Sequence, residues 1–561
     1  MEAEKLLDVE SAESQGPAAR RPWMPRLATC VAALATMATL AFVLYLGAQH
    51  GTVSGDVQRL QRKWWTPWQK PADVVLGIDM GTSGSYMAVY KDEKVEIIKN
   101  NDKPLTPSYV SFAGKDPLVG EAARDKVKES PTQSLYNVKR LMGRDFNDAE
   151  VQKMIKFLPY KIVEKSGKPM ISVNDKLWTP EDVSSLLLAD MRAAAGSQLN
   201  QEVKKAVITV PGYSNDAQRR SMMAAAKKAG FTDVELINKG TADALDYAFR
   251  FARDEMKIIL VYDLGGGFFD ATLAEWSGDG FLEVLGTAGD TTLGGEDFTD
   301  LTTQDLLAKF KHKHGKDMDP GSAQTLRIKV AEAIQALSSS KEVQIQMDVD
   351  GADFKETLTR EKFEALNIAS FQNTLESIDK VLEHSGRPRS DVDEIVLAGS
   401  SSHIPKVEQL VKDYFHKEPK MASPFAARAA GAAIMGTLKG NSDMLVLDVM
   451  PLTVGVQEVG GTMMRLIERS STIPIKKSET WTTSSDNQPK VTIKVYEGER
   501  ALAKDNHCLA EFDVTGIPPQ PRGKPQIEVE FAMDKNAILT ASAKDKVTKK
   551  KFDIVRRGCM K

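Results

Sequence analysis

One run of the sequence, from Ile258 to Asp270, constrains the fold more than any other. Its apolar, β-branched start predicts a buried strand ending at Asp263, and after three glycines a second strand is predicted from Ala271 to Trp276. Glycines lack a Cβ, so their backbone N–H groups can converge on an anion. The flanking acids would repel a phosphate unless they held a cation, directly or through water. The pattern predicts a phosphate-and-magnesium hairpin, with a plain tight hairpin as the alternative.

The same pattern occurs earlier in the chain. Val74 to Gly84 is again a strand, an acid (Asp79) and a turn of small residues, followed by a strand-like run from Ser85 to Tyr90. Two such hairpins far apart predict a duplicated architecture, with one phosphate loop from each half. A third turn, Gly399 to Ser401, follows another predicted strand.

The pattern of elements changes near residues 441–448. Before this segment, strands alternate with helices, which predicts an α/β fold with loops for a nucleotide at strand ends. After it, short alternating runs predict an antiparallel β-sandwich. These runs are Val491–Tyr496, Glu511–Val514, Gln526–Phe531 and Ile538–Ala543.

The N-terminal region predicts a membrane anchor. Residues 27–46 carry no charge and are long enough to span a bilayer, and Arg20, Arg21 and Arg26 precede them. The arginines predict a cytoplasmic tail at 1–26, a transmembrane signal anchor at 27–46 and a juxtamembrane linker at 47–73. The large domain would then lie in the endoplasmic-reticulum or secretory-pathway lumen. A cleaved signal peptide is the alternative.

Net charge bears on nucleic-acid binding, and cysteine content bears on disulfide bonding. The 561 residues carry a net charge of −3, which argues against a general nucleic-acid binder. Three cysteines do not predict a disulfide framework, and Cys508 and Cys559 are interpreted as free thiols.

Both hairpins and the Gly399–Ser401 turn resemble the actin-like ATPase superfamily. The sequence around them resembles the heat-shock protein 70 chaperones. The likeness runs from about Val74 to about Ile554. It rests on the motifs Gly77–Thr82, Thr106–Val110, Val138–Leu141, Asp263–Gly267, Gly289–Phe298, Ser485–Pro489, Val495–Arg500 and Thr515–Pro519.

The resemblance implies an organisation and an activity. It implies an actin-like nucleotide-binding domain of two lobes at 74–440, an interdomain linker at 441–448 and a peptide-binding sandwich at 449–561. The expected ligands are ATP or ADP with Mg²⁺ and extended hydrophobic segments of unfolded polypeptides. J-domain co-chaperones and nucleotide-exchange factors are implied as partners. The family's helical lid is expected to be missing, and the closest likeness is to luminal members.

Family positions map onto this sequence residue by residue. The catalytic candidates are Lys139, Asp79, Asp263 and Asp270, of which Asp79 and Asp263 would hold magnesium through water. Lys139 would orient the γ-phosphate or the attacking water, although any single lysine is more often a solvated helix residue. The nucleotide-binding candidates are Gly81, Thr82, Ser83, Gly265, Gly266, Gly267, Gly294, Gly295, Glu296, Ser338 and Gly399. The peptide-binding candidates are Val456, Val459, Trp481, Ser484, Val491, Ile493 and Ile527, and inward apolar residues of a sandwich are equally consistent with core.

The sequence departs from the family around the nucleotide. Lys239 stands where a carboxylate is expected beside the metal's waters, and like charge near Mg²⁺ is unfavourable. Phe268 replaces a threonine that would donate to phosphate, and its ring is large enough to fill the γ-phosphate space. Gly84 replaces a tyrosine in the first loop.

The adenosine clamp is altered as well. The helix positions that are charged in the family are occupied here by Ala331, Ile334 and Gln335. His403 stands where an arginine is expected over the purine. Losing about three hydrogen bonds at ~1 kcal/mol each would cost roughly a hundredfold in affinity. The alternative is that these substitutions are tolerated around a loose adenine site.

These observations predict a membrane-anchored heat-shock protein 70 chaperone with weakened nucleotide binding and hydrolysis. A fully active ATP-hydrolysing foldase is the competing prediction. A sugar kinase on the same superfamily fold is disfavoured, because the C-terminal sandwich matches a chaperone clamp.

Overall fold

The computed structural model describes residues 74–252, 254–349, 352–422, 426–438 and 444–559, which belong to one compact unit. The predicted tail, membrane span and juxtamembrane linker (1–26, 27–46 and 47–73) lie outside these residues. Within the described residues, no helix is both long enough and apolar enough to cross a membrane.

The first lobe is built on a mixed sheet in the order β12-β11-β1-β2-β3, in which β4 also pairs with β2. Parallel pairing of β1 with β11, and of β11 with β12, brings strand ends to one edge. The sheet's strands are β1 (Val75–Asp79), β2 (Gly84–Lys91), β3 (Lys94–Ile98), β4 (Thr106–Pro107), β11 (Lys205–Val210) and β12 (Asp233–Asn238). Two small sheets complete the lobe: β5 (Val110–Ser111) with β6 (Leu118–Val119) and β7 (Ser134–Leu135), and β8 (Lys161–Lys165) with β9 (Lys168–Val173) and β10 (Lys176–Trp178).

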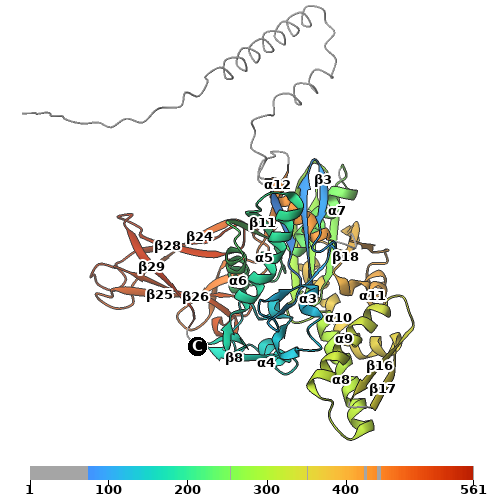
Figure 1. Ribbon diagram of the computed structural model, residues 1–561. Helices are drawn as coiled ribbons and strands as arrows, with labels where there is room; N and C mark the ends of the chain where they lie inside the picture. The colour runs from blue at the N-terminus through green and yellow to red at the C-terminus, as the bar shows by residue number, and fades with distance from the viewer. Residues whose placement is uncertain (1–73, 253, 350–351, 423–425, 439–443, 560–561) are drawn as a thin grey trace, which may run out of the picture. The chain divides into compact units, whose positions relative to one another are not determined.

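The second lobe repeats this plan around β13 and β14, which confirms the predicted duplication of the strand–acid–turn hairpin. Its sheet has the order β19-β18-β13-β14-β15-β20-β23, with β13 parallel to β18 and antiparallel to β14. The strands are β13 (Lys257–Leu264), β14 (Phe269–Trp276), β15 (Phe281–Asp290), β18 (Glu394–Ala398), β19 (Lys420–Met421), β20 (Leu445–Val449) and β23 (Thr472–Ile473). A hairpin of β16 (Glu342–Val349) and β17 (Ala352–Thr359) lies near α8 and α9 (Figure 1).

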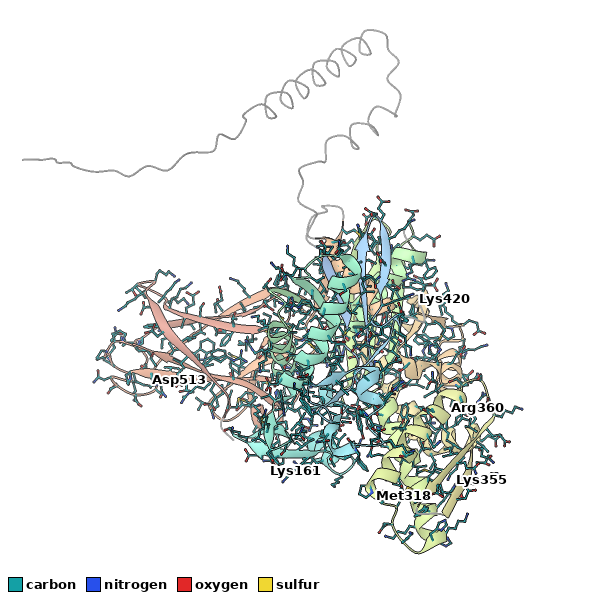
Figure 2. The ribbon with its side chains drawn as sticks, in the orientation of Figure 1. Lys161, Met318, Lys355, Arg360, Lys420 and Asp513 are labelled. Carbon is teal, nitrogen blue, oxygen red and sulfur yellow. A yellow bond between two sulfur atoms is a disulfide. The ribbon has the colours of Figure 1, made fainter. Side chains whose placement is uncertain are left out.

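The helices cover the two sheets and bury their apolar faces. Arg360, at the start of α10, donates a hydrogen bond to the carbonyl of Leu337 and so ties α10 to the end of α9 (Figure 2). The helices are α3 (Glu121–Arg124), α4 (Ala149–Ile155), α5 (Pro180–Leu199), α6 (Asp216–Lys228), α7 (Lys239–Phe251), α8 (Gly295–His314), α9 (Pro320–Ala336), α10 (Arg360–Ser385), α11 (Pro405–Phe415) and α12 (Ala427–Thr437).

The predicted linker forms a strand. β20 pairs in parallel with β15 and in antiparallel with β23, so it extends the sheet of the second lobe. Asp448 accepts hydrogen bonds from Asn238 Nδ2 and Thr241 Oγ1, both at 2.9 Å. Residues 441–443 lie outside the described part of the chain.

The C-terminal region is an antiparallel sandwich. Its strands follow the order β22-β21-β25-β26-β29-β28-β27-β24, and β29 pairs with both β26 and β28. The core contains Phe512 and Phe531, while Asp513 lies on β26 and pairs with Lys490 at 3.3 Å (Figure 2). The strands are β21 (Val454–Gln457), β22 (Met463–Ile467), β24 (Ile475–Trp481), β25 (Lys490–Glu497), β26 (His507–Thr515), β27 (Ile527–Met533), β28 (Leu539–Asp545) and β29 (Lys551–Arg557).

Candidate functional site: a cleft with internal cations

The two glycine loops meet across the cleft between the lobes. A Cβ added at Gly266 would lie 2.4 Å from Ser83 Oγ, and one at Gly267 would lie 3.0 Å from Thr82 Oγ1. A larger residue at either position would have to displace these side chains, so the glycines let the two loops approach closely. The loop after β1 and the loop after β13 therefore come together as predicted from the repeated hairpin.

A cavity of about 730 Å³ opens beside these loops. Most of the predicted nucleotide residues line it. They are Gly81, Thr82, Ser83, Gly265, Gly266, Gly267, Gly295, Glu296, Ser338 and Gly399, together with Asp79 and Asp263. Gly294 lies behind the second loop, where an added Cβ would meet the backbone nitrogen of Gly267 at 2.5 Å.

Two buried cations contact the carboxylates on the cavity floor. Lys239, the first residue of α7, places its Nζ 2.9 Å from Asp79 Oδ1. Arg428, near the start of α12, pairs through Nη2 with Asp263 Oδ1 and lies 3.6 Å, Nη1 to Oδ2, from Asp79. Its Nε donates to Asp243 Oδ2 at 2.8 Å. One guanidinium therefore joins three carboxylates.

Small residues bring the two cations to the same place. A Cβ on Gly431 of α12 would lie 2.0 Å from the carbonyl oxygen of Ala242 on α7, so the two helices touch backbone to backbone. Lys239 and Arg428 both lie in the first turn of their helices, where the dipole disfavours positive charge. The acidic floor supplies the compensating charge.

Charges and burial determine the pKa values of the carboxyl groups on the cavity floor. Burial alone would raise the pKa of Asp79, but the charges of Lys239 and Arg428 outweigh it and hold that pKa well below its ordinary value. Burial and, next, the charge of Asp263 raise the pKa of Asp270 to about 7. Asp270 Oδ1 accepts from the backbone nitrogen of Tyr213 at 3.2 Å, and Oδ2 has no hydrogen-bond partner among the described residues.

Magnesium does not fit these residues as they stand. Oxygen ligands bind a divalent ion through carboxylates that are free to face it or its waters. Here Asp79 and Asp263 are each engaged by a side-chain cation, and both cations line the cavity. The predicted role of the two aspartates as magnesium ligands finds no support in this geometry.

The surroundings of Lys139 also differ from the family pattern, because Phe268 replaces the expected threonine there. Lys139 is buried, and its Nζ donates to the carbonyl of Met80 at 2.5 Å and lies 5.6 Å from the centroid of the Phe268 ring. Burial and then the nearby charge of Lys239 lower the pKa of Lys139 well below its ordinary value. Phe268 lines the cavity, whereas Lys139 and Asp270 lie outside its described lining. Lys139 thus faces backbone and an aromatic ring.

Glu296 joins the lobes at the mouth of the loops. Its Oε1 accepts a hydrogen bond from Ser83 Oγ at 2.6 Å, and its Oε2 pairs with Arg327. Burial acts to raise the pKa of Glu296, but the charge of Arg327 and the bond from Ser83 lower it overall. The carboxylate is therefore ionised and already compensated.

The positions of the expected adenosine clamp also line the cavity, and they carry no carboxylate, lysine or arginine. Ala331, Ile334, Gln335 and His403 line it, as does Ser338. These are the positions where the sequence departs from the adenosine clamp. Phe425, which stands where the resemblance expects an aspartate near that clamp, lies outside the described residues.

The predicted peptide residues divide between core and surface. Val456, Ile493 and Ile527 are buried in the sandwich core, and Val491 is 9% exposed. Trp481 is half-buried and packs edge-on against Phe531. Val459 and Ser484 are exposed. Their predicted role in binding peptides stays a prediction.

The interpretation of Cys508 and Cys559 as free thiols is wrong. The two form a disulfide that joins the start of β26 to the segment after β29. The strands are neighbours in the sheet, which brings the two ends together. The sequence did not indicate this pairing, because the pairing depends on which strands are adjacent.

Sequence reasoning missed Arg428 and Asp243, which complete the charge cluster. A signal was present, since Arg428 is the one charged residue of α12, among alanines and glycines. A lone charge in such a helix needs a buried partner, and Asp243 lies among the buried small residues of α7.

The two lobes, their paired glycine loops and the appended sandwich define an actin-like nucleotide-cleft protein that carries a β-sandwich domain. A family model described as Hsp70 protein matches residues 75–559. The chain belongs to the Hsp70 family, as its sequence motifs predicted. Chaperone activity of the Hsp70 type, with ATP or ADP and Mg²⁺ as the family's general ligands, follows from that membership.

Proposed function

We propose that this protein is an Hsp70-type chaperone that binds extended hydrophobic segments of unfolded polypeptides while its nucleotide binding and hydrolysis are weakened. One observation carries the proposal: the two carboxylates expected to hold the magnesium hydration shell are paired with Lys239 and Arg428.

Electrostatics supports the loss of hydrolysis. In phosphoryl transfer the metal neutralises the charge that develops on the phosphates, and a fixed cation orients the attacking group. A divalent ion about 4 Å from one fixed unit charge is disfavoured by about 8 kcal/mol at an effective dielectric constant of about 20. Two such charges line this cavity. Lys139, the fixed cation of the family, is turned to Met80.

The base end of the cavity supports weaker nucleotide binding. Ala331 and Ile334 cannot make the polar contacts of a charged clamp, and losing about three hydrogen bonds at ~1 kcal/mol each lowers affinity roughly a hundredfold. Weak binding and slow turnover together favour a chaperone whose peptide cycle is poorly coupled to ATP.

The sandwich supports peptide binding. An extended segment can bond its backbone to clamp loops while alternate side chains enter apolar pockets. Val491, on β25, belongs to the sandwich core and is 9% exposed. Trp481 and the exposed Val459 supply apolar surface nearby in the predicted clamp. One buried leucine contributes about 1.5–3 kcal/mol. Micromolar affinity, near −8 kcal/mol, is thus within reach after ordering costs.

Two measurements on the purified full-length protein test the proposal. Single-turnover hydrolysis of Mg-ATP should be far slower than in an ordinary family member, and a labelled leucine-rich peptide should bind saturably in fluorescence anisotropy. Ordinary hydrolysis would favour the competing function, an ATP-driven foldase. Non-saturable peptide binding would remove the clamp assignment.

The location of the protein is part of the proposal. The uncharged residues 27–46, preceded by Arg26, favour a single-pass anchor with the large domain in the lumen. The Cys508–Cys559 disulfide is consistent with an oxidising compartment. J-domain co-chaperones and nucleotide-exchange factors of that compartment would be the partners. Protease digestion of intact microsomes tests the topology, and digestion of the large domain without detergent would reverse it.

A further inference from the structure

We infer that the cleft binds the diphosphate group of a nucleotide without a divalent cation, with Lys239 and Arg428 supplying the positive charge. The inference rests on the proposed function, because it concerns the cleft whose hydrolysis is proposed to be weakened. It goes further by naming the ligand form, a metal-free polyphosphate.

The first step is the position of the charges. Both cations are buried, both contact carboxylates expected to hold the metal's waters, and both line the cavity beside the glycine loops. Because these charges are covalently part of the chain, they cannot be exchanged for magnesium. A metal-complexed phosphate would bring a second set of positive charges to the same place.

The second step is the number of hydrogen-bond donors. An ammonium carries three N–H donors and a guanidinium carries five. Among the described residues, Lys239 pairs with one carboxylate, and the Nε, Nη2 and Nη1 of Arg428 each face one, Nη1 at 3.6 Å, so each ammonium or terminal guanidinium nitrogen still has an N–H to spare. Donors therefore remain on side chains that line the cavity, and a phosphate oxygen is an acceptor for them.

The third step is the set of backbone groups around that space. Gly81–Ser83 from one lobe and Gly265–Gly267 from the other line the same cavity, and glycine turns bind phosphate through backbone N–H groups. The N–H groups of Gly295 and Glu296, at the start of α8, donate to the carbonyls of Gly265 and Gly266 and so hold the second loop in place. Glu296, which accepts a hydrogen bond from Ser83 in the first loop, is already paired with Arg327.

The charges on the floor are partly balanced before an anion arrives. Asp79, Asp243 and Asp263 face Lys239 and Arg428, so the two cations offset two of the three carboxylate charges. Because Ala331 and Ile334 replace charged residues of the adenosine clamp, we expect the phosphates to carry most of the recognition. Inorganic pyrophosphate should therefore keep most of the affinity of ADP.

Isothermal titration of the full-length protein tests this inference, with ADP and with pyrophosphate, each in EDTA and in excess Mg²⁺. We expect binding in EDTA, at least tenfold weaker binding of the magnesium complexes, and pyrophosphate within about tenfold of ADP. Binding that needs Mg²⁺, or no binding of either ligand, would overturn the inference. The ATPase rate that tests the proposed function is measured separately, so the two failures are distinguishable.

Two variants sharpen the test, each checked for folding by circular dichroism. Lys239→Gln keeps a polar side chain without the charge and should weaken metal-free ADP binding at least tenfold. Lys239→Glu restores the family's carboxylate and should make the remaining binding depend on Mg²⁺. Lys168→Gln is the matched control, because Lys168 is exposed and pairs with Asp145 away from the cavity lining. This variant should bind ADP like the parent. A Lys239→Gln protein with unchanged affinity would contradict the inference.

Discussion

Charge organises the floor of the nucleotide cleft, whereas apolar packing organises the β-sandwich. In the cleft, Lys239 and Arg428 pair with buried aspartates. In the sandwich, aromatic side chains such as Phe512 and Phe531 fill a core beneath a largely polar surface. A buried ion pair is specific for its partner and leaves the paired carboxylate unavailable to a metal ion. An apolar residue of the peptide clamp, in contrast, can still contact a bound peptide. The same chain can therefore retain peptide binding while its metal chemistry is lost.

The largest expected effect follows from removing the cation that joins three acids. Arg428→Met leaves Asp79, Asp243 and Asp263 with one buried cation fewer, and breaking a buried pair in this way costs about 3–5 kcal/mol. Urea unfolding measures the loss, and millimolar Mg²⁺ should recover part of it because the freed aspartates can now bind a metal.

Arg465→Met is the control for that variant. Arg465 is half exposed and pairs with Glu468 at 3.3 Å on the sandwich surface, where ion pairs contribute little. Its unfolding curve should match that of the parent with and without Mg²⁺. An Arg428→Met protein as stable as the parent would remove the charge cluster from the account.

The next effect concerns the covalent link in the sandwich. Replacing Cys508 and Cys559 together by serine opens a loop of 51 residues and should cost the sandwich about 2–4 kcal/mol. Denaturant unfolding followed by circular dichroism, compared for the parent and the double variant, measures this change. Equal midpoints for the parent under oxidising and reducing conditions would show that apolar packing alone holds the sandwich.

A smaller effect is expected at the peptide clamp. Val491→Phe should fill the central pocket and weaken binding of the leucine-rich peptide at least tenfold, about 1.4 kcal/mol. Val555→Phe places the same ring at an exposed position of β29 and should bind like the parent. The clamp assignment fails if both variants bind equally and circular dichroism shows both folded.

The smallest effect is a dependence on pH. Because burial raises the folded pKa of Asp270 to about 7 from an unfolded value of 3.8, the folded state holds this proton more tightly. Its contribution to stability is complete below pH 3.8 and is lost as the pH rises to 7, by about 1 kcal/mol between pH 6 and 7. Asp270→Asn should flatten that part of the curve.

Asp319→Asn serves as the control for this series, since hydrogen bonds from Ser322 lower the pKa of Asp319 and keep it ionised across that range. An Asp270→Asn curve parallel to that of the parent would mean that Asp270 is ionised at neutral pH.

The sequence predicted those features that depend on neighbouring residues. The two strand–acid–turn hairpins, with Asp79 and Asp263 at their strand ends, are local patterns and form as β1–β2 and β13–β14. The family motifs led to the correct family. The sequence also showed that Lys239 alters the cleft, because a lysine stands there in place of an expected carboxylate.

Features that depend on distant contacts were not predicted. Arg428 and Asp243 are 185 positions apart and meet only because α7 and α12 pack closely. The disulfide needed the adjacency of β26 and β29. The linker became β20 because the edge of β15 was available for pairing. Each outcome is set by tertiary neighbours, which a local pattern does not contain.

The account's central claim is that Lys239 and Arg428 stand in place of the metal, and electron paramagnetic resonance of Mn²⁺ tests it most directly. Mn²⁺ prefers the same oxygen ligands as Mg²⁺ and loses its free-ion signal when bound. Titrated into the full-length protein with saturating ADP, Mn²⁺ should give the same free signal as a matched solution of ADP without protein. A stoichiometric, micromolar loss of that signal, restored by Asp79→Asn, would show a working metal site and contradict the account.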